Sequence, residues 1–209
     1  MNQPNRQTEP RNWVTVSIPW LTPTELAQVI GNHPRRLFGL NPTLRLDHWE
    51  ADPGPLHPGW HTQMHGFNES NNQNITCRLA CSQLPDGWLL TYDSGWKASL
   101  EITWQEHNQQ GAALTLTERY HPLPDQPEEQ TARAQAIDPS LIPWGRTIRR
   151  YLFWRTRLGW IPFCRWYLEW LPDLKPTTRR IVRLLVWSGV IELLVLILLL
   201  GGMRLGGMG

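Results

Sequence analysis

Four polar side chains fall at positions where a strand should turn them inward. The alternation of apolar residues places these four on the apolar faces of their strands: His48, Tyr92, Glu118 and Tyr120. A buried carboxyl, imidazole or phenol can act as a general acid or base, or can anchor the polar end of a ligand. The candidate catalytic residues are therefore Glu118, His48 and Tyr92. Two other placements stay open, with Glu118 solvated at a cavity mouth or strand end and His48 exposed at a strand end.

Three histidines, His57, His61 and His65, recur every fourth position, but the spacing argues against a metal site. On a strand, His61 and His65 would lie ~13 Å apart, too far to share one zinc ion whose ligands sit at ~2.1 Å. A loop could still bring His57 and His61 together. The sequence carries no Gly-rich phosphate loop, no Cys-x-x-Cys pair and no Gly-x-Ser-x-Gly elbow. We expect neither a metal nor a cofactor.

The three cysteines are predicted to be free thiols. Cys77 and Cys81 fall on one face of a predicted strand, where four residues span ~13 Å, too far for a disulfide. A cytoplasmic compartment also keeps thiols reduced. We therefore interpret Cys77 and Cys81 as small apolar core residues.

The order of predicted elements is one strand, two short helices, a run of strands and a long helix. Val14, Val16 and Ile18 alternate as in a half-buried strand, and Thr22 followed by Glu25 is typical of a helix N-terminus. Short connections favour antiparallel hairpins. The predicted elements span residues 13–18, 22–31, 34–40, six strands within 43–120, and a helix over 141–158.

This order resembles that of the START-like SRPBCC superfamily, which includes polyketide cyclases/dehydrases and lipid-transport proteins. The segments VTVSIPWLTPTELAQVI and GLNPTL carry the resemblance, which covers about residues 12–158. It implies an α+β helix-grip fold, in which a curved antiparallel β-sheet surrounds a long C-terminal helix and leaves an apolar cavity between them. An extension after Leu158 departs from the family pattern.

The apolar sheet faces need a cover, and the stripe of the helix over 141–158 is long enough to supply it. A hydrophobic ligand pocket remains if sheet and helix do not close tightly. The expected ligand-binding residues are the inward-facing ones of both elements: Leu46, Met64, Cys77, Leu79, Leu90, Tyr92, Ile102, Trp104, Leu116, Glu118, Trp144, Ile148 and Leu152.

An apolar run near the C-terminus, Leu184 to Met203, is long enough to cross a bilayer, because twenty residues of helix span ~30 Å. Its eight Leu, two Ile and three Val favour insertion by about 4 to 8 kcal/mol. Glu192 opposes insertion by about 2.5 to 3.5 kcal/mol if ionised near the centre. The favourable insertion free energy of the apolar residues exceeds this cost. The alternative is that this segment forms a buried core helix of a soluble domain.

Charge is distributed unevenly. Residues 1–143 carry nine basic and fifteen acidic residues, whereas residues 144–183 carry ten basic and two acidic ones. Basic and aromatic residues collect at bilayer surfaces, and basic flanks stay cytoplasmic. We therefore expect a single-pass, tail-anchored protein of the inner (cytoplasmic) membrane, with its N-terminal domain in the cytoplasm. The expected membrane or partner contacts are Trp160, Trp166, Trp170, Ser188, Gly189 and Glu192.

Three functions stay open, all in a chain organised as a disordered N-terminus (1–11), a START-like domain (12–158), a basic, Trp-rich interfacial segment (159–180), a transmembrane helix (181–203) and a short tail (204–209). The first is a membrane-tethered binding protein for a lipid, quinone, isoprenoid or pigment. The second is a polyketide cyclase/dehydratase-like enzyme. The third is a non-catalytic subunit of a membrane complex, which contacts other integral membrane proteins through its anchor. Membrane lipid is the expected surface partner, and nucleic acid is not.

Overall fold

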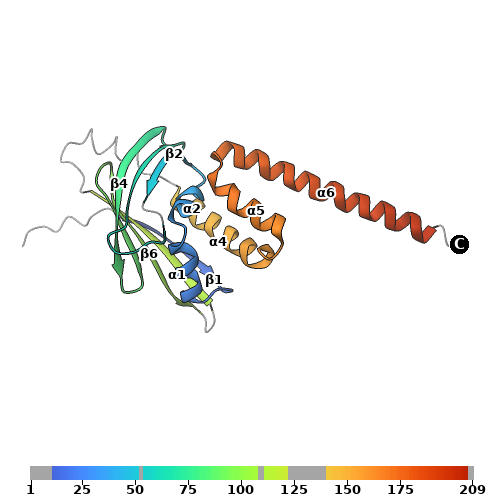
Figure 1. Ribbon diagram of the computed structural model, residues 1–209, viewed down its shortest axis with the longest axis horizontal. Helices are drawn as coiled ribbons and strands as arrows, with labels where there is room; N and C mark the ends of the chain where they lie inside the picture. Colours follow the sequence, from blue (N-terminus) through green and yellow to red (C-terminus); the bar gives the residue numbers. More distant parts are fainter. Residues whose placement is uncertain (1–10, 52–53, 108–110, 122–139, 207–209) are drawn as a thin grey trace, which may run out of the picture. The chain divides into compact units, whose positions relative to one another are not determined.

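The computed structural model of the chain describes residues 11–51, 54–107, 111–121 and 140–206. The chain divides into two compact units, Met1–Asp173 and Leu174–Gly209 (Figure 1). The sheet and the shorter helices belong to the first unit, and the long last helix belongs to the second. Most of the N-terminal segment expected to be disordered (1–10) lies outside the described residues, while Arg11 already belongs to the first strand.

A seven-stranded antiparallel sheet forms the body of the first unit, in the order β1-β7-β6-β5-β4-β3-β2. Consecutive strands from β2 to β7 are neighbours, as the short connections predict. β1 instead pairs with β7, so the chain crosses the sheet between β1 and β2. The strands are β1 (Arg11–Ile18), β2 (Leu44–Ala51), β3 (His61–Asn68), β4 (Gln73–Leu84), β5 (Gly87–Tyr92), β6 (Lys97–His107) and β7 (Gly111–Tyr120).

Two short helices make that crossing, α1 (Pro23–Gly31) and α2 (Pro34–Gly39). α1 begins with a capping box, in which the Glu25 amide donates to the Thr22 hydroxyl and the Thr22 amide donates to the Glu25 carboxylate at 2.9 Å. The Thr22 amide and the Thr22 hydroxyl both donate to this carboxylate and hold the pKa of Glu25 below its usual value. The Thr-Pro-Thr-Glu helix start read from the sequence is confirmed.

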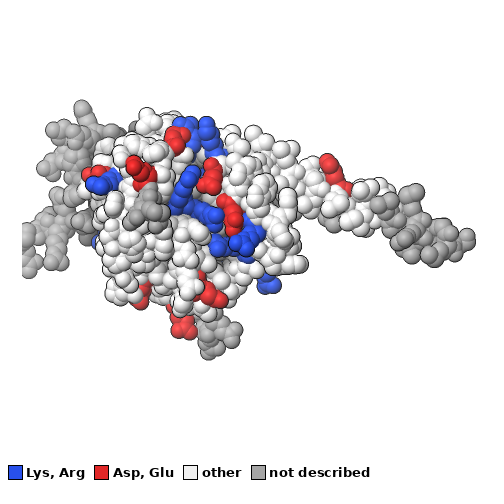
Figure 2. Space-filling model, in the orientation of Figure 1, with Lys and Arg blue, Asp and Glu red and all other residues white. Residues whose placement is uncertain are grey.

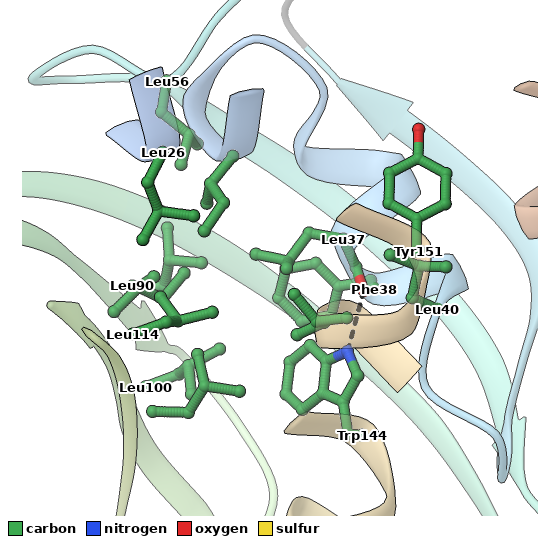
Figure 3. Close-up of a cluster of buried hydrophobic side chains, with 14 of the residues drawn as sticks. Leu26, Leu37, Phe38, Leu40, Leu56, Leu90, Leu100, Leu114, Trp144 and Tyr151 are labelled. Atoms are coloured by element: carbon green, nitrogen blue, oxygen red, sulfur yellow. Dashed lines mark hydrogen bonds between the residues drawn. The ribbon is translucent and has the colours of Figure 1, made fainter. Parts of the chain in front are cut away.

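The long helix α4 (Leu141–Leu158) packs on the inner face of the sheet. Gly145 permits a close approach to β1, because a Cβ at that position would meet methyl groups of Val14 and Val16 at 3.2 Å. The indole N–H of Trp144 donates to the carbonyl of Leu37 at 2.9 Å and so joins α4 to α2 (Figure 3). The predicted α+β helix-grip fold is confirmed: a curved antiparallel sheet closed by a long C-terminal helix.

Aromatic rings fill the space between α2, α4 and the β2–β3 edge. The ring centroid of Phe38 lies 5.7 Å from that of Trp144 and 5.3 Å from that of Trp49. Trp49 in turn lies 6.2 Å from Trp60. Aliphatic side chains complete this core around the rings (Figure 3): Leu26, Leu37, Leu40, Leu56, Leu90, Leu100 and Leu114.

The first unit extends past α4 to Asp173. Helix α5 (Pro162–Trp170) contacts α4, and the short 3₁₀ helix η1 (Leu171–Asp173) contacts α2. Leu168 and Leu171 are buried in these contacts, and Arg35 forms an ion pair with Asp173 at 3.5 Å. The segment expected to begin an extension after Leu158 therefore belongs to the compact unit as far as Asp173.

The second unit is dominated by one helix, α6 (Pro176–Gly206). Within its first 24 residues, Pro176–Leu199, the most apolar window of 18 residues has a mean hydropathy of 2.4, and that window is not buried within the chain. By length and composition, this helix is able to cross a membrane. Its exposed side chains include Leu184, Ile191 and Leu198.

Substitution Gly39→Ala is expected to destabilise the first unit. A Cβ on Gly39 would lie 2.5 Å from the backbone oxygen of Pro172, and neither backbone can move without disturbing the contact between α2 and η1. We expect a loss of about 1 to 3 kcal/mol in unfolding free energy, measured by urea denaturation in detergent micelles.

Gly31→Ala is the matched control, because its Cβ would meet only the Trp88 indole nitrogen, at an ordinary 3.5 Å. Its effect should stay within about 0.5 kcal/mol. Equal stability of the two variants would show that η1 does not pack on α2 as described.

Candidate functional site

A cavity of about 460 Å³ opens at one end of the sheet. It lies between the β3–β4 hairpin, the β5–β6 connection, the end of β7 and the first turn of α4. Ligand pockets for small molecules fall in the range of about 300 to 1,000 Å³. The lining residues outside the Asn- and Gln-rich turn include Phe38, Leu44, Met64, Ile75, Cys77, Tyr92, Trp96, Lys97, Tyr120 and Trp144.

The cavity wall changes from apolar to polar between its inner part and its mouth. Met64, Cys77 and Trp144 are no more than 4% exposed and form the inner part. Amide side chains of the β3–β4 turn form the mouth, where Asn72 and Asn74 are exposed. Such a gradient suits a molecule that places an apolar body inside and a polar end near solvent.

A buried charged group lies beside the cavity. The carboxylate of Glu118 is 1% exposed and accepts from the Lys97 ammonium at 2.6 Å and from the Tyr120 hydroxyl at 2.7 Å. Lys97 and Tyr120 line the cavity, whereas Glu118 lies behind them. The carboxylate thus fixes the positions of an ammonium and a phenol that line the cavity. The predicted inward position of Glu118 is confirmed, and its solvated alternative does not fit the burial.

Lys97 was not a candidate from the sequence, because a β-bulge changes its direction. Tyr120 pairs with Lys97 and Arg119 pairs with Ser99, so Ala98 is an extra residue in β6. In a regular strand, the alternation that turns Leu100 and Ile102 inward would direct Lys97 outward. Because Ala98 is an extra residue, the side chains before it face the opposite way, and the Lys97 ammonium reaches Glu118.

A second bulge has the opposite effect on His48: its predicted inward position is wrong, and the alternative of an exposed His48 fits the structure. Leu46 pairs with Gly66 and His48 pairs with His65, so Asp47 is the extra residue in β2. The His48 side chain is 62% exposed, and the half-buried Trp49 takes the core position instead. The structure therefore does not bring together the three candidate catalytic residues: Tyr92 lines the cavity, Glu118 lies behind its wall and His48 lies outside.

The expected ligand-binding residues divide between the cavity and the packed core. Four line the cavity: Met64, Cys77, Tyr92 and Trp144. Leu46 and Trp104 are partly buried against the core, and the remaining aliphatic ones are no more than 2% exposed and lie within it: Leu79, Leu90, Ile102, Leu116, Ile148 and Leu152. Of these, Ile148 and Leu152 border a small second hollow of about 20 Å³ beneath α1 and α2.

The amide-rich turn was also missed from the sequence. The run NESNNQN, residues 68–74, supplies five of the cavity's lining side chains: Asn68, Asn71, Asn72, Gln73 and Asn74. Asn72 has a φ of 55°, a left-handed conformation that Asn tolerates in turns. The clustering of amides was visible in the sequence, but it also fits an ordinary hairpin turn, so it did not indicate a site.

The predicted membrane-contact residues lie in both units. Trp160, Trp166 and Trp170 are exposed in the first unit, around α5. In α6 the Ser188 hydroxyl donates to the Glu192 carboxylate at 3.2 Å, one helical turn away, and Gly189 has open space at its Cβ position. This hydrogen bond lowers the cost of placing a polar side chain in an apolar helix.

A larger hollow, of about 620 Å³, lies on the surface and is bordered by charged side chains, among them Glu50, Arg78 and Asp93. Its open, charged border does not suit an apolar ligand. Within the ranges that the structure describes, no three His, Cys, Asp or Glu side chains gather as metal ligands.

Comparison with known proteins concerns the fold alone. No protein-family model matches the sequence, and no curated protein does. The chain is similar to the major latex-like protein 151 of Panax ginseng, with a TM-score of 0.47 at 10% identity over 68% of this chain and 96% of that one.

Two bacterial structures are similar to a comparable degree. Protein Ms6760 from Mycobacterium smegmatis has a TM-score of 0.47 at 15% identity over 68% of this chain and 90% of its own. Protein NE0264 from Nitrosomonas europaea has a TM-score of 0.44 at 8% identity over 69% and 97%. Likenesses of this size transfer no ligand and no activity.

Removing Lys97 alone should destabilise the first unit more than removing both charges of the Lys97–Glu118 ion pair. Lys97→Met leaves a buried Glu118 carboxylate without its ammonium, which costs about 3 to 5 kcal/mol. Adding Glu118→Gln removes that charge and keeps an acceptor for Tyr120, so the double variant should be more stable than Lys97→Met alone. Urea denaturation of both variants measures the coupling.

Arg119→Met is the matched control. Arg119 also forms an ion pair across β6 and β7, with Glu101 at 2.7 Å, but its side chain is 40% exposed. Loss of this exposed ion pair should lower the unfolding free energy by less than about 1 kcal/mol. Equal losses of unfolding free energy in Lys97→Met and Arg119→Met would contradict the buried position of Glu118.

The three thiols should differ in reactivity. Burial raises the pKa of Cys77 from 9.0 to about 12 and that of Cys81 to about 11, whereas Cys164 is only half-buried. These shifts lower the thiolate fractions about 1,000-fold and about 100-fold. N-ethylmaleimide at neutral pH should therefore modify Cys164 first by a wide margin, as mass spectrometry of peptides would record. Rapid modification of Cys77 in the folded protein would show that the inner cavity is open to solvent.

Proposed function

We propose that this chain is a membrane-tethered binding protein for a small hydrophobic molecule, such as a lipid, quinone, isoprenoid or pigment. The observation that carries the proposal is the cavity of about 460 Å³ with an apolar inner part and a polar mouth. The helix-grip fold supports it, since a sheet that surrounds one helix leaves space at the end that the helix does not fill.

The lining indicates how such a molecule would lie. Its apolar body would contact Met64, Cys77 and Trp144, where burial contributes about 25 cal/mol per Å² of apolar surface. Its polar end would lie near the amides of the β3–β4 turn. Lys97 on the side wall would donate to a carbonyl or hydroxyl oxygen part-way along the molecule, and the Tyr120 hydroxyl, which donates its proton to Glu118, could accept from a hydroxyl there.

The proposed tether is α6. A window of mean hydropathy 2.4 supports a membrane span, and the basic residues Arg179, Arg180 and Arg183 near its N-terminal end support a cytoplasmic side for the first unit. In this arrangement, the binding unit stays near the bilayer in which an apolar ligand dissolves. The tether raises the effective concentration of that ligand at the cavity.

Filling the cavity should abolish ligand binding without unfolding the protein. Ile75 is half-buried at the cavity wall, so the larger side chain of Ile75→Trp would occupy part of the space. Protein extracted gently from its own membrane should carry an apolar molecule detectable by native mass spectrometry. The variant should carry at least about tenfold less, equivalent to ~1.4 kcal/mol.

Ala80→Trp is the matched control, because Ala80 is exposed on the same strand and points to the opposite face. It should retain the molecule at the wild-type level. Equal occupancy in both variants, or wild-type protein that carries no apolar molecule, would contradict the proposed function.

A further inference from the structure

Helix α5 exposes a row of aromatic rings. Phe163, Trp166 and Trp170 recur at helical spacing and are 64%, 57% and 39% exposed. The rings of Trp166 and Trp170 are stacked with centroids 5.6 Å apart, and Phe163 lies 6.2 Å from Trp166. The opposite side of the helix carries Leu168, which is buried. We call Phe163, Trp166 and Trp170 the aromatic stripe.

The stripe is continued by Trp160, which is 79% exposed just before α5. The first unit already buries the other side of this helix, so these rings do not serve its own core. A contiguous exposed apolar patch marks a surface that contacts something else. Trp in particular prefers the boundary between water and hydrocarbon, because its ring is apolar and its N–H is polar.

The helix against which α5 packs is strongly basic. α4 contains five Arg and no acidic residue. Among the described residues, no carboxylate pairs with its four exposed arginines, which are Arg146, Arg149, Arg150 and Arg157. Figure 2 shows basic side chains gathered, with some acidic ones among them, over the part of the first unit where α2, α4 and α5 lie. Exposed arginines on the helix that contacts α5 complement an anionic lipid surface.

Chain connectivity keeps this surface near the bilayer. Only Leu174 and Lys175 separate η1 from α6, and the uninterrupted apolar run of α6 begins at Leu184. Two extended residues and eight helical ones reach at most about 20 Å. The C-terminal end of α5 and η1 therefore lies within about 20 Å of the hydrocarbon wherever α6 enters it. No other described helix of the first unit is so closely bound to the span.

We propose that α5 is a second membrane-binding element, which lies in the plane of an anionic bilayer surface with its aromatic stripe at the boundary between headgroups and acyl chains. The proposal rests on the membrane tether of the proposed function and adds that the folded unit itself binds the surface. The arginines of α4 contact the headgroup phosphates beside it. The unit is then held against the membrane by two elements.

The test uses the full chain in lipid nanodiscs, with an environment-sensitive NBD label on an introduced cysteine. Phe163→Cys places the label in the stripe, in a Cys164→Ser background that leaves only the buried Cys77 and Cys81. Trp13→Cys is the matched control. Trp13 is 63% exposed, and because its neighbour Val14 faces α4, it points to the other side of the sheet.

Doxyl groups attached near the lipid headgroups should quench the label at residue 163 at least about twofold more than the label at residue 13 in discs rich in phosphatidylglycerol. Discs of phosphatidylcholine alone, or high salt, should weaken the difference, because the arginine contribution is electrostatic. A label at 163 that stays in water while α6 is inserted would overturn the proposal. So would shielding that requires an added protein partner rather than lipid.

Failure of this proposal is distinguishable from failure of the proposed function. Resistance of the protein to carbonate extraction reports the α6 tether, and the co-purifying apolar molecule reports the cavity. Both can hold while the label at residue 163 remains in water, in which case only the role of α5 is lost.

Discussion

The fold depends on how one helix covers the concave face of the sheet. Gly145 lets α4 lie close to β1, and the Trp144 indole fixes its first turns to the backbone of α2. The helix is therefore closest to the edge of the sheet formed by β1. At the far end, the long β3–β4 hairpin and the end of β7 enclose the cavity together with Phe38 of α2 and Trp144 in the first turn of α4. α1 contacts β6 and β7 and α2 contacts β2, so three helices cover the sheet and the cavity remains beside them.

Most of the fold could be predicted from the sequence because its signals are periodic. The alternation in β7, where Leu114, Leu116 and Glu118 face inward, predicted both the strand and the inward direction of the carboxylate, and the structure shows that it is buried. The apolar stripe of α4 predicted the helix that covers the sheet. Periodicity is a local property, and these elements are regular over their whole length, so the inference holds.

The site was harder to predict because it depends on two residues that interrupt the alternation. Asp47 turns His48 out of the core, and Ala98 turns Lys97 toward Glu118. A bulge changes the parity of every residue beyond it, yet neither position carries a Gly or another signal in the sequence. The amides of the mouth were missed for a different reason, since Asn is also the ordinary residue of a hairpin turn.

The amide mouth lies entirely on one hairpin turn, in which Asn72 adopts the left-handed conformation. None of these side chains takes part in the apolar core, whereas Met64 and Trp144 serve the core and the cavity together. In the proposed function, selectivity for the exposed end of the ligand would thus be separated in the chain from the residues that maintain the fold. Evolution could then lengthen, shorten or recharge this turn, and so exchange one ligand for another, without weakening the framework that holds it.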